Sequence, residues 1–135
     1  MKKNIFSVME EVRASDKERI DLVIFLNGFA IITFELKCNI AGQSYEDAVY
    51  QYRMERNPKT RLFLFKAGAL VNFAMDLEQV YMTTKLEKEA TFFLPFNMGN
   101  GEGVNAGAEI QYLKINIVFS ICGKMYLQKI PFLKS

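Results

Sequence analysis

RIDLVIFLNGFAIITFELK, residues 19–37, is the stretch that decides the fold of this chain. Its two apolar runs, 20–26 and 29–36, are rich in β-branched and aromatic residues and flank the pair Asn27-Gly28. An Asn-Gly pair between apolar runs is the strongest short-range signal for a β-hairpin. Because both runs are apolar almost throughout, we expect both faces of the sheet to be covered, with helices packed on it.

Three charged residues interrupt this hairpin: Asp21, Glu35 and Lys37. Side chains alternate along a strand, so Glu35 and Lys37 share a face. Direct pairing across a two-residue turn would leave Asp21 on the other face. A three-residue turn or a bulge would pair Leu26 with Ala30 and set Asp21 across from Glu35. Facing carboxylates in an apolar setting need a cation to neutralise them, so we predict this one-residue offset and a bound metal.

The same charges have a simpler interpretation. An acid followed after about fourteen residues by Glu-x-Lys occurs by chance in many chains, and charges at strand ends are usually just solvated. The apolar context favours the functional interpretation, because an uncompensated charge inside such strands is costly.

The rest of the chain predicts one α/β domain of 135 residues. Ser44 begins a predicted helix that ends before Asn57-Pro58, with acidic residues in its first turn and arginines near its end. The other predicted elements are an edge strand at 4–13, a polar turn at 14–18, strands at 61–66, 69–75 and 91–96, a glycine-rich loop at 99–108 and a closing strand pair.

Composition excludes several classes of protein. The chain has no histidine, which removes Ser-His, Cys-His and His-zinc mechanisms. Cys38 and Cys122 lack the spacing of a zinc site. A net charge of +2 is compatible with nucleic acid without pointing to it. No apolar run approaches the roughly 20 residues needed to span a bilayer, so we expect no membrane partner and a cytoplasmic protein.

Residues 19–42, RIDLVIFLNGFAIITFELKCNIAG, resemble the nuclease core in the R (restriction) subunit of type I restriction-modification enzymes, usually written RPD-apolar-NG-apolar-ELK. The segments 47–86 and 91–103 continue to resemble that subunit in order and spacing, so the resemblance covers roughly residues 4–107. It implies a PD-(D/E)xK nuclease: an α/β, restriction-endonuclease-like fold with a mixed central sheet flanked by helices, here incomplete.

The resemblance also implies site residues. Asp21 and Glu35 would bind Mg²⁺ together with the backbone carbonyl of Leu36, and Lys37 would be the catalytic lysine beside these two acids. Ile20 replaces the usual proline, which should matter little because the metal ligand is the aspartate.

Family members often carry a QxxxY signature on the helix after the core. Gln51 stands where its glutamine would fall, but Glu55 takes the place of the tyrosine, although Tyr52 adjoins Gln51. We therefore expect Gln51 to position the lysine or DNA, and we name Arg53 with it as a DNA-binding residue. A polar residue on a helix surface is the alternative interpretation of Gln51.

The implied function is that of a type I site-specific deoxyribonuclease, a Mg²⁺-dependent endonuclease that cuts double-stranded foreign DNA. Its partners would be DNA and, in the full-length parent, the modification and specificity subunits. No GxxxxGK[ST] motif occurs, so no ATP site is expected in this chain. The alternatives are an inactive remnant of the same subunit, and a DNA-binding module using the basic residues Arg53, Arg56, Lys59 and Arg61, which otherwise form a solvated basic edge.

The division of the chain follows from where the resemblance ends. Residues 1–107 would be an N-terminally truncated endonuclease core. Near Gly107 the family continues with Gly-Asn-Pro and later a Tyr-Leu-Trp segment, which residues 108–135 lack. Back-translation of this tail with AT-rich codons, read from the third codon position, yields both tripeptides. We therefore expect 108–135 to be a frameshifted tail, or a closing hairpin if it is ordered.

Overall fold

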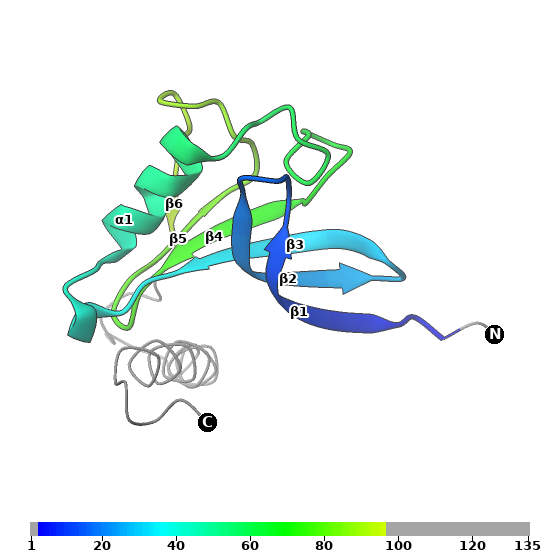
Figure 1. Cartoon of the computed structure of the whole chain (residues 1–135), viewed down its shortest axis with the longest axis horizontal. Helices are drawn as coiled ribbons and strands as arrows, with labels where there is room; N and C mark the ends of the chain where they lie inside the picture. Colours follow the sequence, from blue (N-terminus) through cyan, green and yellow to red (C-terminus); the bar gives the residue numbers. More distant parts are fainter. Residues whose placement is uncertain (1–2, 97–135) are drawn as a thin grey trace, which may run out of the picture.

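The computed structural model describes residues 3–96, and these residues form a six-stranded mixed sheet (Figure 1). The strands lie in the sheet in chain order, and every neighbouring pair is antiparallel except β3 and β4, which are parallel. Their bounds are β1 (Phe6–Arg13), β2 (Arg19–Leu26), β3 (Phe29–Leu36), β4 (Val71–Met75), β5 (Val80–Thr83) and β6 (Leu94–Pro95). The predicted α/β class with a mixed sheet is therefore confirmed.

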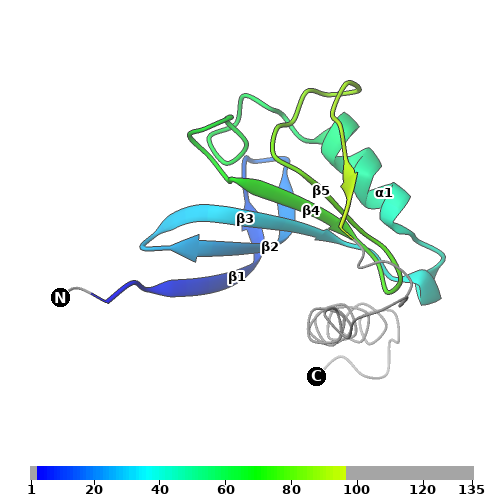
Figure 2. The same cartoon turned by 180° about the vertical axis from the view of Figure 1, so that it is seen from behind.

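A helical crossover joins the two parallel strands. It comprises the short 3₁₀ turn η1 (Asn39–Ala41), the α-helix α1 (Tyr45–Tyr50) and the π-helical turn η2 (Gln51–Glu55). Both views show α1 lying across one face of the sheet, while β1 and the β2–β3 hairpin extend beyond it (Figures 1 and 2). No helix within residues 3–96 is long and apolar enough to cross a bilayer.

The helix begins where the sequence predicts. The Ser44 hydroxyl accepts a hydrogen bond from the Glu46 N–H at 3.3 Å, and the Ser44 N–H donates to Asp47 at 2.8 Å. This reciprocal capping box satisfies N–H groups that the first helical turn leaves free. The second half of the predicted helix is π-helical, a form that often occurs at functional sites, and it ends at the extended residue Arg56.

The β2–β3 register carries the predicted one-residue offset. Asn27 and Gly28 both have positive φ, as a tight two-residue turn requires, and Leu26 pairs with Phe29. The register then shifts between Ile24 and Phe25, so the offset arises from a bulge inside the strands. The predicted pairing of Leu26 with Ala30 is wrong, because the turn itself keeps two residues.

Beyond the bulge, Leu22 pairs with Phe34. One further step along this antiparallel register sets Asp21 across from Glu35 on the same face of the sheet. The bulge thus produces the juxtaposition that the sequence predicts.

Two apolar clusters cover the two faces of the sheet. On the helix side, Tyr52 and Ala48 pack with Val23 and Ala74 of the strands. The opposite face is lined by a second cluster: Leu22, Leu36, Cys38, Met75 and Val80. The helix-side face also carries buried polar groups, among them Thr33, Glu35 and Asn72. Polar side chains buried between sheet and helix need partners, and these partners define the site described below.

The predicted strand at 61–66 is wrong. This run forms consecutive turns, with the Phe63 N–H donating to the Thr60 carbonyl at 2.9 Å and the Gly68 N–H donating to the Leu64 carbonyl at 2.7 Å. Only Phe63 of the run is buried in the core, so the segment needs no alternating strand face.

Further differences from the prediction concern the extent and the number of the strands. The strand predicted at 91–96 shrinks to β6, and the one predicted at 69–75 begins at Val71 as β4. No strand was predicted at the position of β5, so the structure adds this strand to the expected elements. The predicted glycine-rich loop, the closing strand pair and the 108–135 tail lie outside the described residues.

Candidate functional site

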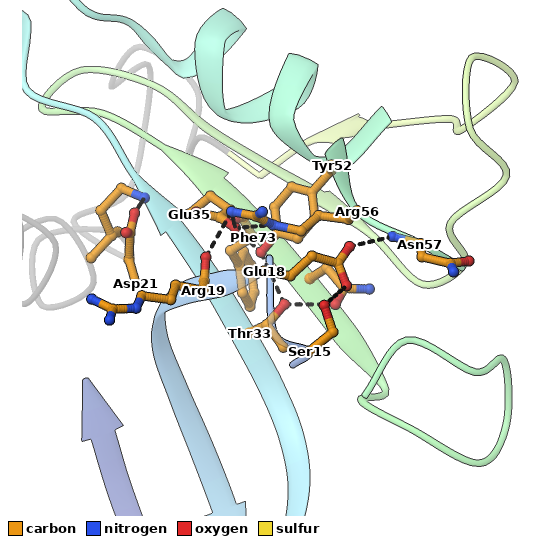
Figure 3. Close-up of polar contacts among 12 residues, drawn as sticks. Ser15, Glu18, Arg19, Asp21, Thr33, Glu35, Tyr52, Arg56, Asn57 and Phe73 are labelled. Atoms are coloured by element: carbon orange, nitrogen blue, oxygen red, sulfur yellow. Dashed lines mark hydrogen bonds and ion pairs between the residues drawn. The ribbon is translucent and has the colours of Figure 1, made fainter. Parts of the chain in front are cut away.

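Asp21 and Glu35, called here the acid pair, lie on adjacent strands beneath the helical crossover (Figure 3). Asp21 is half-buried, and its Oδ2 accepts a hydrogen bond from the Leu36 N–H at 2.7 Å. Glu35 is fully buried, with a side chain that is 0% exposed. The bulge in the hairpin places a half-buried carboxylate across from a fully buried one.

The Glu35 carboxylate has one occupied and one free oxygen. Arg56 donates a hydrogen bond to Oε1 from Nε at 2.8 Å, and its Nη2 forms an ion-pair contact with the same oxygen at 2.7 Å. Oε2 is buried and has no hydrogen-bond partner among the described residues. A buried carboxylate oxygen without a partner is costly unless it is protonated or binds a cation.

The charges around the acid pair also favour the binding of a proton or a cation. Burial raises the pKa of Glu35 to about 8, and the negative charge of Asp21 adds to this rise. The cations Arg56 and Lys37 act against it without cancelling it. Bringing a further positive charge to the pair would therefore stabilise the ionised form.

Arg56 contacts the acid pair although the sequence analysis did not place it there. The sequence assigned it to a solvated basic edge, and this is wrong because Arg56 is only 5% exposed. Its Nη2 also donates to the Arg19 carbonyl at 2.8 Å, two residues before Asp21. The available signal was the need of a buried Glu35 for a cation, but the sequence offers several arginines and no means of choosing among them.

A buried acid, Glu18, fixes the segment that follows Arg56. Glu18 accepts a hydrogen bond from the Asn57 N–H at 2.7 Å through Oε1. Its Oε2 accepts from the hydroxyls of Thr60 at 3.3 Å and Ser15 at 3.0 Å. These contacts tie the end of the crossover to the turn between β1 and β2 (Figure 3).

Tyr52 holds the crossover to the sheet at the centre of the site. Its side chain is fully buried, and its hydroxyl lies 2.9 Å from the Thr33 hydroxyl and donates to the Phe73 carbonyl at 3.1 Å. The Thr33 hydroxyl in turn donates to Asn72 at 2.6 Å. Burial raises the pKa of Tyr52 well above its usual value, so the phenol stays a neutral donor.

The remaining predicted site residues are Lys37, Gln51 and Arg53, and of these Lys37 is linked to the acid pair through the action of its charge on Glu35. Lys37 is half-buried, follows Leu36 at the end of β3, and donates its N–H to the Met75 carbonyl at 2.9 Å. Gln51 begins η2, and its Oε1 is buried without a partner among residues 3–96. Arg53 donates to the Thr91 carbonyl from Nε at 3.2 Å and from Nη2 at 2.9 Å. Its side chain therefore serves the packing of the crossover.

The donor set of the acid pair fits a hard divalent cation. Mg²⁺ binds through one or two carboxylates and retains several waters. Asp21, the free Oε2 of Glu35 and the Leu36 carbonyl could supply such oxygens. Within residues 3–96 no group of three or more acidic or cysteine side chains could hold a metal, so any ion here would depend on these few oxygens and on water.

Comparison with known proteins identifies the family. Residues 1–91 match the family described as type I restriction enzyme R protein N terminus. No curated protein and no solved structure matches the chain. The match covers more than half of the 135 residues and includes both members of the acid pair. The chain therefore belongs to the family formed by the N-terminal region of the type I restriction enzyme R protein.

Proposed function

We propose that this chain carries a divalent-metal-dependent DNA endonuclease site of the PD-(D/E)xK type, built on Asp21, Glu35 and Lys37. The observation that carries the proposal is the free, buried Oε2 of Glu35 on the strand beside Asp21. Family membership in the R proteins of restriction enzymes supports DNA as the substrate. In the parent complex, the modification and specificity subunits would be its partners.

The residues present divide the chemistry among them. Asp21, Glu35 and the Leu36 carbonyl would hold Mg²⁺. A metal bound there would polarise a phosphate and lower the pKa of a bound water. Lys37, whose charge already acts on Glu35, would orient the attacking water or offset negative charge on the phosphoryl group. Burial around Glu35 keeps bulk water from screening these interactions.

The residues predicted to bind DNA have a smaller part in this proposal. Gln51 remains part of the proposed site because its Oε1 is buried without a partner among the described residues. This oxygen could accept a hydrogen bond from Lys37 or from a bound water. Arg53 is engaged with Thr91 and with the Phe93 ring, 5.5 Å from its guanidinium carbon. It would contact DNA only through a rearrangement of these contacts.

A plasmid-cleavage assay with Mg²⁺ tests the proposal. We expect Lys37→Ala and Asp21→Asn to abolish cleavage, while circular dichroism shows an unchanged fold. Asparagine keeps an oxygen that can accept the Leu36 N–H bond, so it removes charge with little change of shape. Lys17→Ala is the matched control, because Lys17 is an exposed lysine outside every proposed site. Full activity in either site variant would dispose of the assignment.

One observation favours a second candidate, a non-catalytic module of the same R protein. Arg56 already forms a buried ion pair with Glu35 and offsets part of the charge of this acid without any metal. Under this alternative Arg56 would be the permanent partner of Glu35, and the acid pair would bind no ion. Calorimetric titration with Mn²⁺ separates the candidates: binding that Glu35→Gln removes supports the nuclease, and no binding supports the module.

A further inference from the structure

The contact between Arg56 and Glu35 has an unusual form. An arginine guanidinium commonly binds a carboxylate as a fork, with one N–H group on each oxygen. Here Nε and Nη2 both converge on Oε1, at 2.8 and 2.7 Å. The second oxygen of Glu35 is left free although it is buried. The arginine therefore fixes the carboxylate without using up its capacity to bind another group.

Arg56 is held in place by contacts that do not involve Glu35. Its backbone N–H donates to the Gln51 carbonyl at 3.0 Å, and its carbonyl accepts from Lys88 Nζ at 3.1 Å. The next residue, Asn57, is bound through its N–H by Glu18 at 2.7 Å. The guanidinium is thus presented by an anchored backbone at the end of η2.

The same guanidinium joins the two strands that carry the acid pair. Nη2 donates to the Arg19 carbonyl at 2.8 Å, at the start of the strand that carries Asp21. It also contacts Glu35 on the neighbouring strand (Figure 3). One planar, rigid group thereby sets the position of β2 relative to the Glu35 carboxylate.

We propose that Arg56 is a positioning residue for the cation site: its guanidinium holds Oε1 of Glu35 and leaves Oε2 free to bind a divalent cation. This inference rests on the proposed function. Partners that orient a metal ligand typically contribute about 10- to 100-fold to metal affinity. The role assigned to Arg56 is geometric, so a positive charge alone does not fulfil it.

The test is a titration of the metal-free full chain with Mn²⁺, in which electron paramagnetic resonance measures the free ion. We expect Arg56→Gln to weaken Mn²⁺ binding by about 10- to 100-fold. Arg56→Lys keeps the charge but loses the planar guanidinium that contacts both Glu35 and Arg19, so binding should weaken here too. Arg61→Gln, at an exposed arginine, is the matched control and should leave the affinity unchanged.

Each result has one meaning. Wild-type Mn²⁺ affinity in a folded Arg56→Lys variant would overturn the inference, since charge alone would then suffice. Tighter binding in Arg56→Gln would also overturn it, because Arg56 would then only repel the ion. If Arg56→Gln does not fold, Arg56→Lys decides. A wild-type chain that binds no Mn²⁺ overturns the proposed function, and this inference with it. Binding in the wild type that the Arg56 variants leave unchanged overturns the inference alone.

Discussion

The charge on Glu35 should make the stability of the metal-free protein depend on pH. Burial raises the pKa of this carboxyl from 4.5 to about 8 in the folded state. In the unfolded chain the group ionises near its ordinary value. Between these two pH values the folded state keeps a proton that the unfolded state has lost, so stability falls as pH rises.

The size of the effect follows from the interval. Each pH unit inside it changes the folding equilibrium constant by close to a factor of ten. Over the whole interval the Glu35 contribution amounts to on the order of 5 kcal/mol. The contribution is fully present below pH 4.5 and lost by about pH 8. Glu35→Gln cannot titrate, so this part of the pH dependence should be absent from the variant.

Urea denaturation at pH 5, 6, 7 and 8, in EDTA and followed by circular dichroism, measures this difference. The free energy of unfolding of the wild type should fall relative to that of Glu35→Gln as pH rises, because all other titrating groups cancel in the comparison. Asp21→Asn removes the second cause of the raised pKa and should end the fall at a lower pH. Parallel curves for wild type and Glu35→Gln would refute the reasoning, since they would mean that Arg56 fully compensates the buried charge.

The remaining predictions concern the scaffold around the site. Tyr52→Phe removes the donor to the Phe73 carbonyl and should lower the free energy of unfolding by about 1–3 kcal/mol in urea; no loss would mean that water replaces the hydroxyl. Ser44→Ala removes the helix cap and should cost about 1 kcal/mol by the same measurement; a neutral result would show that the Asp47 half of the box suffices. Gly68→Ala would press a Cβ against the Leu62 carbonyl oxygen and should lower the melting temperature; an unchanged value would show that this turn can shift.

The sequence by itself determined the hairpin, its one-residue offset and the start of the helix. These features are local. Asn27-Gly28 sets the turn, Ser44 sets the cap, and the cost of a charge in an apolar strand predicts that Asp21 and Glu35 face one another. The family resemblance implied the same two acids as site residues. The match to the R protein N terminus supports the family itself.

Only the tertiary structure decided which basic residue pairs with the Glu35 carboxylate. The choice of Arg56 depends on where η2 ends and on how Glu18 holds the following residue, and neither is encoded in the spacing of arginines along the chain. The prediction of a strand at 61–66 was wrong for a related reason. The apolar residues of this segment are compatible with a strand or with a packed turn. The turn forms because Phe63 packs into the core against residues that are distant in the chain. Local sequence fixes backbone preferences, whereas the partner of a buried charge is fixed by contacts between residues distant in the chain.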